Sequence, residues 1–115
     1  MSTNTITEIA RRKINLIADK YADAVDRLLK LQIARTREYT KAAKFAMFAA
    51  AAESDAERKR LTAYAEGALA EASETAAELG TAARVLIAIA GTLEAYGLPA
   101  DPEILRMAHT AAANH

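Results

Sequence analysis

The residues whose spacing could support binding chemistry are basic. Four of them recur at multiples of seven residues and would form one stripe along a helix, and two clusters of three lie near residues 12 and 59. Rows of cations of this kind can follow the phosphates of a nucleic acid. The candidate contacts for that function are Arg11, Arg12, Lys13, Lys20, Arg27, Lys41, Arg58, Lys59 and Arg60.

The same charges also have a structural interpretation, which we favour. Residues 1–60 carry 13 Lys and Arg against 8 Asp and Glu, whereas residues 61–115 carry 2 against 7. Two helical arms of opposite charge attract each other, and an interhelical pair such as Lys41–Glu71 would contribute about 0–1 kcal/mol. Aromatic residues make up only 5% of the chain, which leaves little for stacking on single-stranded bases.

The remaining reactive residue types do not assemble into a catalytic motif. There is no cysteine, the only histidines are His109 and His115, and no Glu-x-x-His pair occurs. The sequence also lacks a glycine-rich phosphate loop and a nucleophile elbow. The acids Glu71, Glu74 and Glu78 are typical of a solvated helix face. We therefore expect no enzyme activity, no cofactor and no metal site.

The composition predicts one all-α domain covering residues 1–115. Thirty of the residues are alanine, the best helix former, and there are only 4 Gly and 2 Pro. The apolar runs 45–52 and 85–93 are shorter than the roughly 20 residues that a bilayer span requires. The N-terminus has no basic region followed by an apolar stretch. We expect a cytoplasmic protein.

A heptad pattern in the second half of the chain predicts how the helices pack. Apolar or small residues recur at spacings that alternate between four and three residues for about five repeats. This pattern is typical of a left-handed coiled coil. The fold class expected is therefore an antiparallel two-helix coiled-coil hairpin with a short C-terminal helix. The seam consists of Leu61, Ala65, Ala68, Ala72, Thr75, Leu79, Ala82, Leu86, Ile89, Leu93 and Tyr96.

Capping signals place the helices at about 5–52, 55–96 and 102–113. Ser54 and Glu57 match a capping box that would begin the second helix. Gly97 is a suitable left-handed C-cap, and Asp101 before Pro102 is a suitable start for the third. The alternative is one uninterrupted helix that passes through Ser54.

Folding the chain about residue 55 brings together residues whose numbers sum to about 110. Leu28 then faces Ala82, and Ala42 faces Ala68, so large side chains oppose small ones or the backbones approach closely. Arg35 and Glu38 interrupt the apolar seam opposite Thr75. We interpret these three as a polar layer that fixes the helix alignment; an ion pair lining a ligand cavity is the alternative.

Large apolar residues that lie off the seam require a further partner. A two-helix hairpin cannot bury both of its faces, and the short third helix covers only part of its length. A dimer with a four-helix core is the simplest solution, and a lipid surface is the weaker alternative. The predicted oligomer interface is Val25, Leu29, Ile33, Tyr39, Leu69 and Ile87.

These patterns favour a non-enzymatic helical protein–protein interaction module, such as a scaffold, adaptor or assembly subunit. It would associate with itself and with another protein that the residues do not identify. The alternative function is a nucleic-acid-binding accessory protein that uses the basic edge of the first helix.

Overall fold

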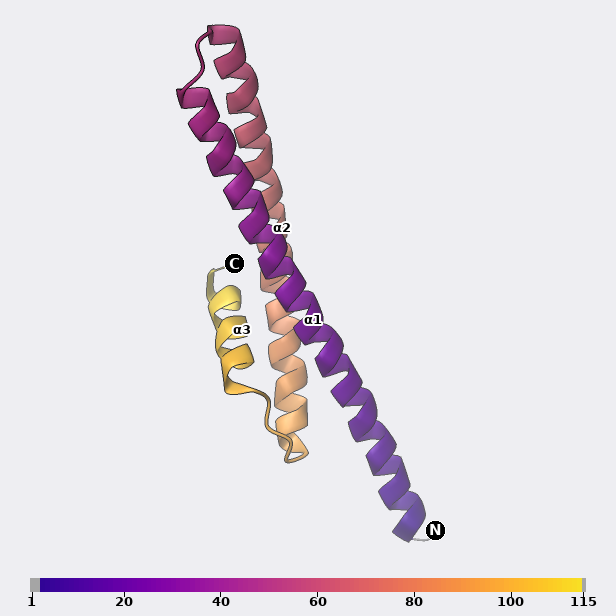
Figure 1. Cartoon of the computed structure of the whole chain (residues 1–115). Helices are drawn as coiled ribbons and strands as arrows, with labels where there is room; N and C mark the ends of the chain where they lie inside the picture. Colours follow the sequence, from indigo (N-terminus) through magenta and orange to yellow (C-terminus); the bar gives the residue numbers. More distant parts are fainter. Residues whose placement is uncertain (1–2, 115) are drawn as a thin grey trace. The chain divides into compact units, whose positions relative to one another are not determined.

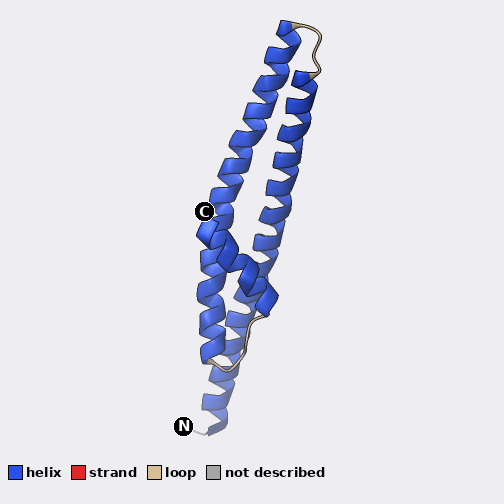
Figure 2. Cartoon of the chain, turned by 90° about the vertical axis from the view of Figure 1, so that its left-hand side faces the viewer, coloured by secondary structure: helices blue, strands red, loops and turns tan. Residues whose placement is uncertain are grey.

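The computed structural model describes residues 3–114 and contains three helices (Figure 1). Helix α1 is Thr3–Ala50, α2 is Asp55–Ala95 and α3 is Pro102–Asn114, and no strand occurs in this part of the chain (Figure 2). Helices α1 and α2 pack against each other as a hairpin. The predicted all-α hairpin is confirmed, and each helix boundary lies within two residues of its expected position.

The connection between α1 and α2 is closed by local hydrogen bonds. The last turn of α1 ends with the Ala52 N–H donating to the Ala49 carbonyl at 3.2 Å. Ser54 then caps α2, because its Oγ accepts from the Glu57 N–H at 3.2 Å. The Arg58 guanidinium contacts Asp55 Oδ1 at 3.0 Å and the Ala52 carbonyl at 3.4 Å. The chain therefore breaks at the predicted position.

The end of α2 is a Schellman motif centred on Gly97. The Gly97 N–H donates to the Glu94 carbonyl at 2.9 Å, and the Leu98 N–H donates to the Leu93 carbonyl at 3.0 Å. This geometry requires a positive φ, which is 80° at Gly97. A residue with a Cβ would be strained at this position.

Helix α3 begins at a side-chain cap and runs back along α2 (Figures 1 and 2). Asp101 Oδ1 accepts from the Glu103 N–H at 2.8 Å, and Pro102 occupies the first helical position. Ala108 and Ala111 are the buried residues of α3. Small side chains at these points allow the short helix to pack closely.

The hairpin consists of two compact units, each with parts of both long helices. Unit 1 is Met1–Leu29 with Leu79–His115, and unit 2 is Lys30–Glu78. In unit 1 the side chains of Leu28, Leu79 and Leu86 are fully buried. In unit 2 the buried hydrophobic residues within the described chain are all alanines: Ala42, Ala49, Ala65, Ala68, Ala72 and Ala76.

The predicted seam of α2 is buried or half-buried from Leu61 to Leu93. Tyr96 is the exception, because its side chain is 40% exposed. It lies beyond Ala95, where α2 ends and the chain turns into the Gly97 motif. The buried positions of the seam therefore end at Leu93, and Tyr96 is a partly exposed residue just beyond the helix.

Two glycine substitutions should change stability in opposite directions. Gly91 lies within α2 and an added Cβ would meet nothing within 4 Å, so Gly91→Ala should stabilise the protein by about 0.5–1 kcal/mol. Gly97→Ala should destabilise it by about 1 kcal/mol because of the positive φ. Urea unfolding at one fixed protein concentration measures both values. If the two variants changed the free energy of unfolding equally, the assignment of a Schellman motif at Gly97 would be contradicted.

Candidate interaction sites

A hydrogen bond joins two residues of the polar layer predicted from the sequence. The Thr75 hydroxyl donates to Glu38 Oε1 at 2.9 Å, a part-buried bond that joins α1 to α2 within unit 2. Arg35 is half-buried on the same helix as Glu38. The bond agrees with the register expected from the sequence at Glu38 and Thr75.

The second carboxylate oxygen of Glu38 is a buried polar atom without a hydrogen-bond partner among the described residues. Burial of an unpaired polar atom costs free energy. This unpaired oxygen reduces what the layer contributes to the stability of the hairpin.

The six predicted interface residues divide into two groups. Val25 and Ile87 are half-buried. They belong to unit 1, where α3 adds a third helix to the packing. The other four keep much of their surface exposed: Leu29 38%, Ile33 53%, Tyr39 45% and Leu69 46%.

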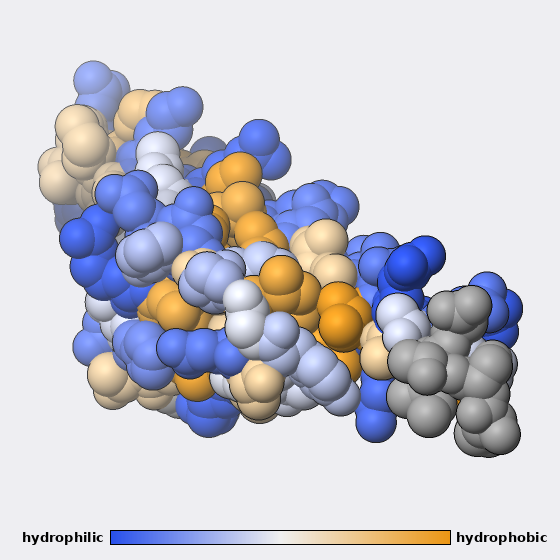
Figure 3. Space-filling view, turned by 90° about the horizontal axis from the view of Figure 1, so that it is seen from below, coloured by the Kyte–Doolittle hydropathy of each residue, from blue (hydrophilic) through white to orange (hydrophobic). Residues whose placement is uncertain are grey.

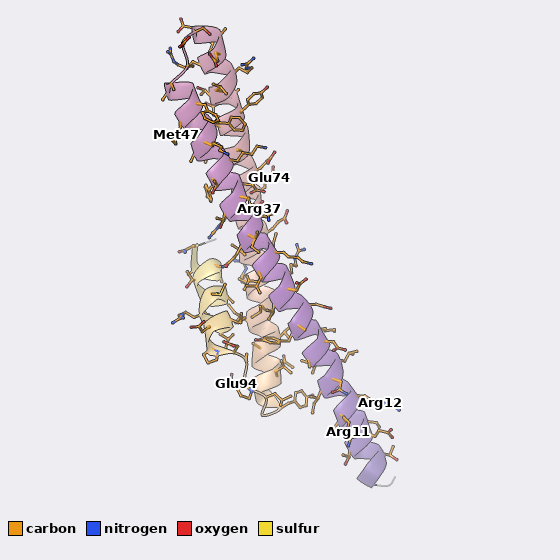
Figure 4. All side chains as sticks on the ribbon, in the orientation of Figure 1. Arg11, Arg12, Arg37, Met47, Glu74 and Glu94 are labelled. Atoms are coloured by element: carbon orange, nitrogen blue, oxygen red, sulfur yellow. The ribbon has the colours of Figure 1, made fainter. Side chains whose placement is uncertain are left out.

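The nine candidate nucleic-acid contacts are all exposed side chains. Arg12 lies 3.6 Å from Glu8, and Arg58 is held by Asp55 in the hairpin turn. The residues up to Arg27 belong to unit 1, whereas Lys41 and the cluster 58–60 belong to unit 2. Figure 4 labels Arg11 and Arg12 near the N-terminal end of α1. Each unit therefore exposes its own group of cations.

A groove in unit 2 was not anticipated from the sequence. It encloses about 330 Å³ and is lined by residues of both long helices. The rings of Phe45 and Tyr64 meet across it with centroids 5.4 Å apart and planes inclined at 51°. The lining residues are Lys41, Phe45, Ala63, Tyr64, Gly67, Ala68 and Glu71.

The ion pair predicted between Lys41 and Glu71 is absent. Both residues line the groove, yet no ion pair joins them among the residues that the structure describes. Their side chains stand on opposite walls of an open groove and face solvent, where a pair gains little free energy. That prediction was wrong, because heptad spacing fixes the helix face but not the reach of two side chains across a gap.

Other surface features of the described chain do not converge on a chemical site. No group of three or more His, Cys, Asp or Glu in residues 3–114 is placed to hold a metal ion. Figure 3 shows apolar patches among hydrophilic surface when the molecule is seen from below. The exposed large apolar residues of unit 1 include Ile9, Leu16, Leu29, Val85 and Leu98.

Among the residues that the structure describes, one helix is long and apolar enough to cross a membrane by length and composition alone. An 18-residue window of α2 has a mean hydropathy of 1.4, although 44% of that window is buried inside the protein. The uninterrupted apolar runs considered in the sequence are shorter than this window, which tolerates occasional charges. The core helix of a helical bundle meets the same criterion, so this finding is weak support for a membrane span.

Comparison with known proteins gives no family assignment. No family model, no curated protein and no solved structure matches the chain. The functional argument therefore depends on the surfaces described above.

A double-mutant cycle should test the polar layer. Thr75→Val removes the donor but keeps the shape, and it leaves the Glu38 carboxylate without its bond from Thr75; we expect a loss of about 1 kcal/mol. Glu38→Leu combined with Thr75→Val should restore or exceed wild-type stability, because neither polar partner remains. Thermal unfolding of the four proteins measures the coupling. Strictly additive effects would show that the 2.9 Å bond contributes nothing.

Proposed function

We propose that the protein is a non-enzymatic helical interaction module that works by self-association and by presenting helix surfaces. In this role it is a scaffold, adaptor or assembly subunit, and its partners are further copies of itself and another protein. The proposal assigns it no catalytic residue, cofactor or metal ion.

The main support is the contrast between the core and the surface of unit 2. Its buried hydrophobic residues in the described chain are alanines only, while Ile33, Tyr39 and Leu69 are 53%, 45% and 46% exposed. Alanine removes little apolar area from water, and burial of larger side chains contributes about 25 cal/mol per Å². Covering these three residues with another protein surface would therefore bury large apolar side chains, which are missing from the fully buried positions of unit 2.

Association through this surface is the simplest use of the exposed side chains. Scattered exposed apolar residues are ordinary, but apolar residues that recur on neighbouring helices of a thin core favour an interface. The sequence-based interface of Val25, Leu29, Ile33, Tyr39, Leu69 and Ile87 remains our proposal for the contact between copies. A lipid surface could cover the same residues and is the weaker alternative.

Charge placed in the proposed interface should weaken self-association. We expect Leu69→Asp to raise the dissociation constant by at least about tenfold, because a carboxylate would be buried without a partner. Leu16→Asp is the matched control, since Leu16 is 60% exposed but lies outside the predicted interface. Sedimentation equilibrium measures the dissociation constant of each variant. A monomeric wild type at high micromolar concentration would overturn the proposal.

The alternative function is nucleic-acid binding through the exposed basic residues. If it holds, duplex DNA should bind at low salt, and the affinity should fall steeply as salt rises, with a slope of about −0.9 for each phosphate neutralised. Fluorescence anisotropy with a labelled duplex measures this dependence. An interaction module of the kind proposed should show no binding even at low salt. Binding that is lost on Lys13→Glu with Lys20→Glu would instead favour the alternative.

A further inference from the structure

Two ridges of opposite charge flank the groove of unit 2. Lys41 lines one wall, and Arg37 and Lys44 lie four residues before it and three after it, on the same face of α1. Glu71 lines the other wall, and Glu74 lies three residues further along α2. Figure 4 labels Arg37 and Glu74 at a similar level on the two helices. Beside the groove the surface is thus basic at residues 37–44 of α1 and acidic at residues 71–74 of α2, whereas the basic cluster 58–60 of α2 lies toward the hairpin turn.

These five side chains are exposed, and none of them forms an ion pair with another described residue. Opposite charges that remain apart within one chain are available to a second molecule. The partner that would complement them must present acidic residues to α1 and basic residues to α2. A second copy of the same chain carries both ridges with this spacing.

The groove between the ridges has room for apolar side chains. Gly67 lies on its α2 wall, and an added Cβ there would meet nothing within 4 Å. Tyr64 is 53% exposed, and Phe48, one turn beyond Phe45 on α1, is 51% exposed. An opposing copy would bury these aromatic rings together with its own, and aromatic side chains contribute strongly to protein interfaces.

The charge pattern selects one of the two symmetric arrangements. A two-fold axis perpendicular to the helices would place α1 against α1 of the other copy, so that Lys41 and its neighbours would repel each other. A two-fold axis parallel to the helices places α1 against α2 of the other copy. Each Lys41 then faces a Glu71 of the second copy, and the contact occurs twice.

We infer that a second copy of this chain docks on the groove in a parallel two-fold arrangement, with the basic ridge of α1 against the acidic ridge of the other α2. The inference rests on the proposed self-association and adds a salt-sensitive contact on a face of α2 different from that of Leu69. Exposed ion pairs weaken as salt screens them, whereas an apolar contact does not.

Charge reversal at the two groove residues provides the test. Lys41→Glu should face Glu71 of a like copy twice, and Glu71→Lys should face Lys41 twice, so each variant alone should raise the dissociation constant of the salt-sensitive step by about tenfold. An equimolar mixture restores both contacts, one with native and one with reversed polarity, and should recover wild-type association. Lys59→Glu is the matched control, because Lys59 is an exposed lysine outside the groove.

Sedimentation velocity at low and high salt, with circular dichroism to verify folding, separates the outcomes. The inference is supported if both single variants lose self-association at low salt and their mixture recovers it. Unchanged association in both variants, loss without recovery, or stronger association of Lys41→Glu would overturn it. If Leu69→Asp weakens association while the groove variants do not, the proposed function stands and only the groove contact fails.

Discussion

The close approach of α1 and α2 along small side chains is the constraint on which the rest of the structure depends. Eleven of the fifteen buried hydrophobic residues in the described chain are alanines. Alanine at the contact allows two helices to lie near the short end of the usual 8–10 Å range of interaxial distances. It also buries little apolar area, and in unit 2 the larger side chains Ile33, Tyr39 and Leu69 remain exposed. The thin core and the exposed apolar surface therefore have one cause.

Local chemistry explains why the sequence predicted the helix boundaries. Ser54, Gly97 and Asp101 each form their predicted capping bond with residues two to four positions away, and such bonds depend on little beyond the nearby chain. The heptad seam was also predictable, because a repeat of seven fixes which side of a helix faces its neighbour. The hydrogen bond between Glu38 and Thr75 follows from the same register.

Features that depend on side-chain reach were not predictable from spacing. Tyr64 lies off the seam, yet its ring reaches Phe45 and helps to form the groove. Lys41 and Glu71 occupy the expected faces but do not meet. In both cases the outcome depends on how far a long side chain extends across an open surface, and a one-dimensional pattern contains no such distance. The exposed glycine Gly67 is the only local signal of a gap at this place.

The different cores of the two units have a consequence for hydrogen exchange. A fully buried leucine contributes about 1.5–3 kcal/mol, and unit 1 contains Leu28, Leu79 and Leu86 in that state, whereas unit 2 has alanine at its buried positions. Local opening should therefore require less free energy in residues 30–78, and backbone amides there should exchange with solvent sooner than those around the three leucines. A molecule that covers unit 2 would slow this exchange, so binding and local ordering of that segment are thermodynamically coupled.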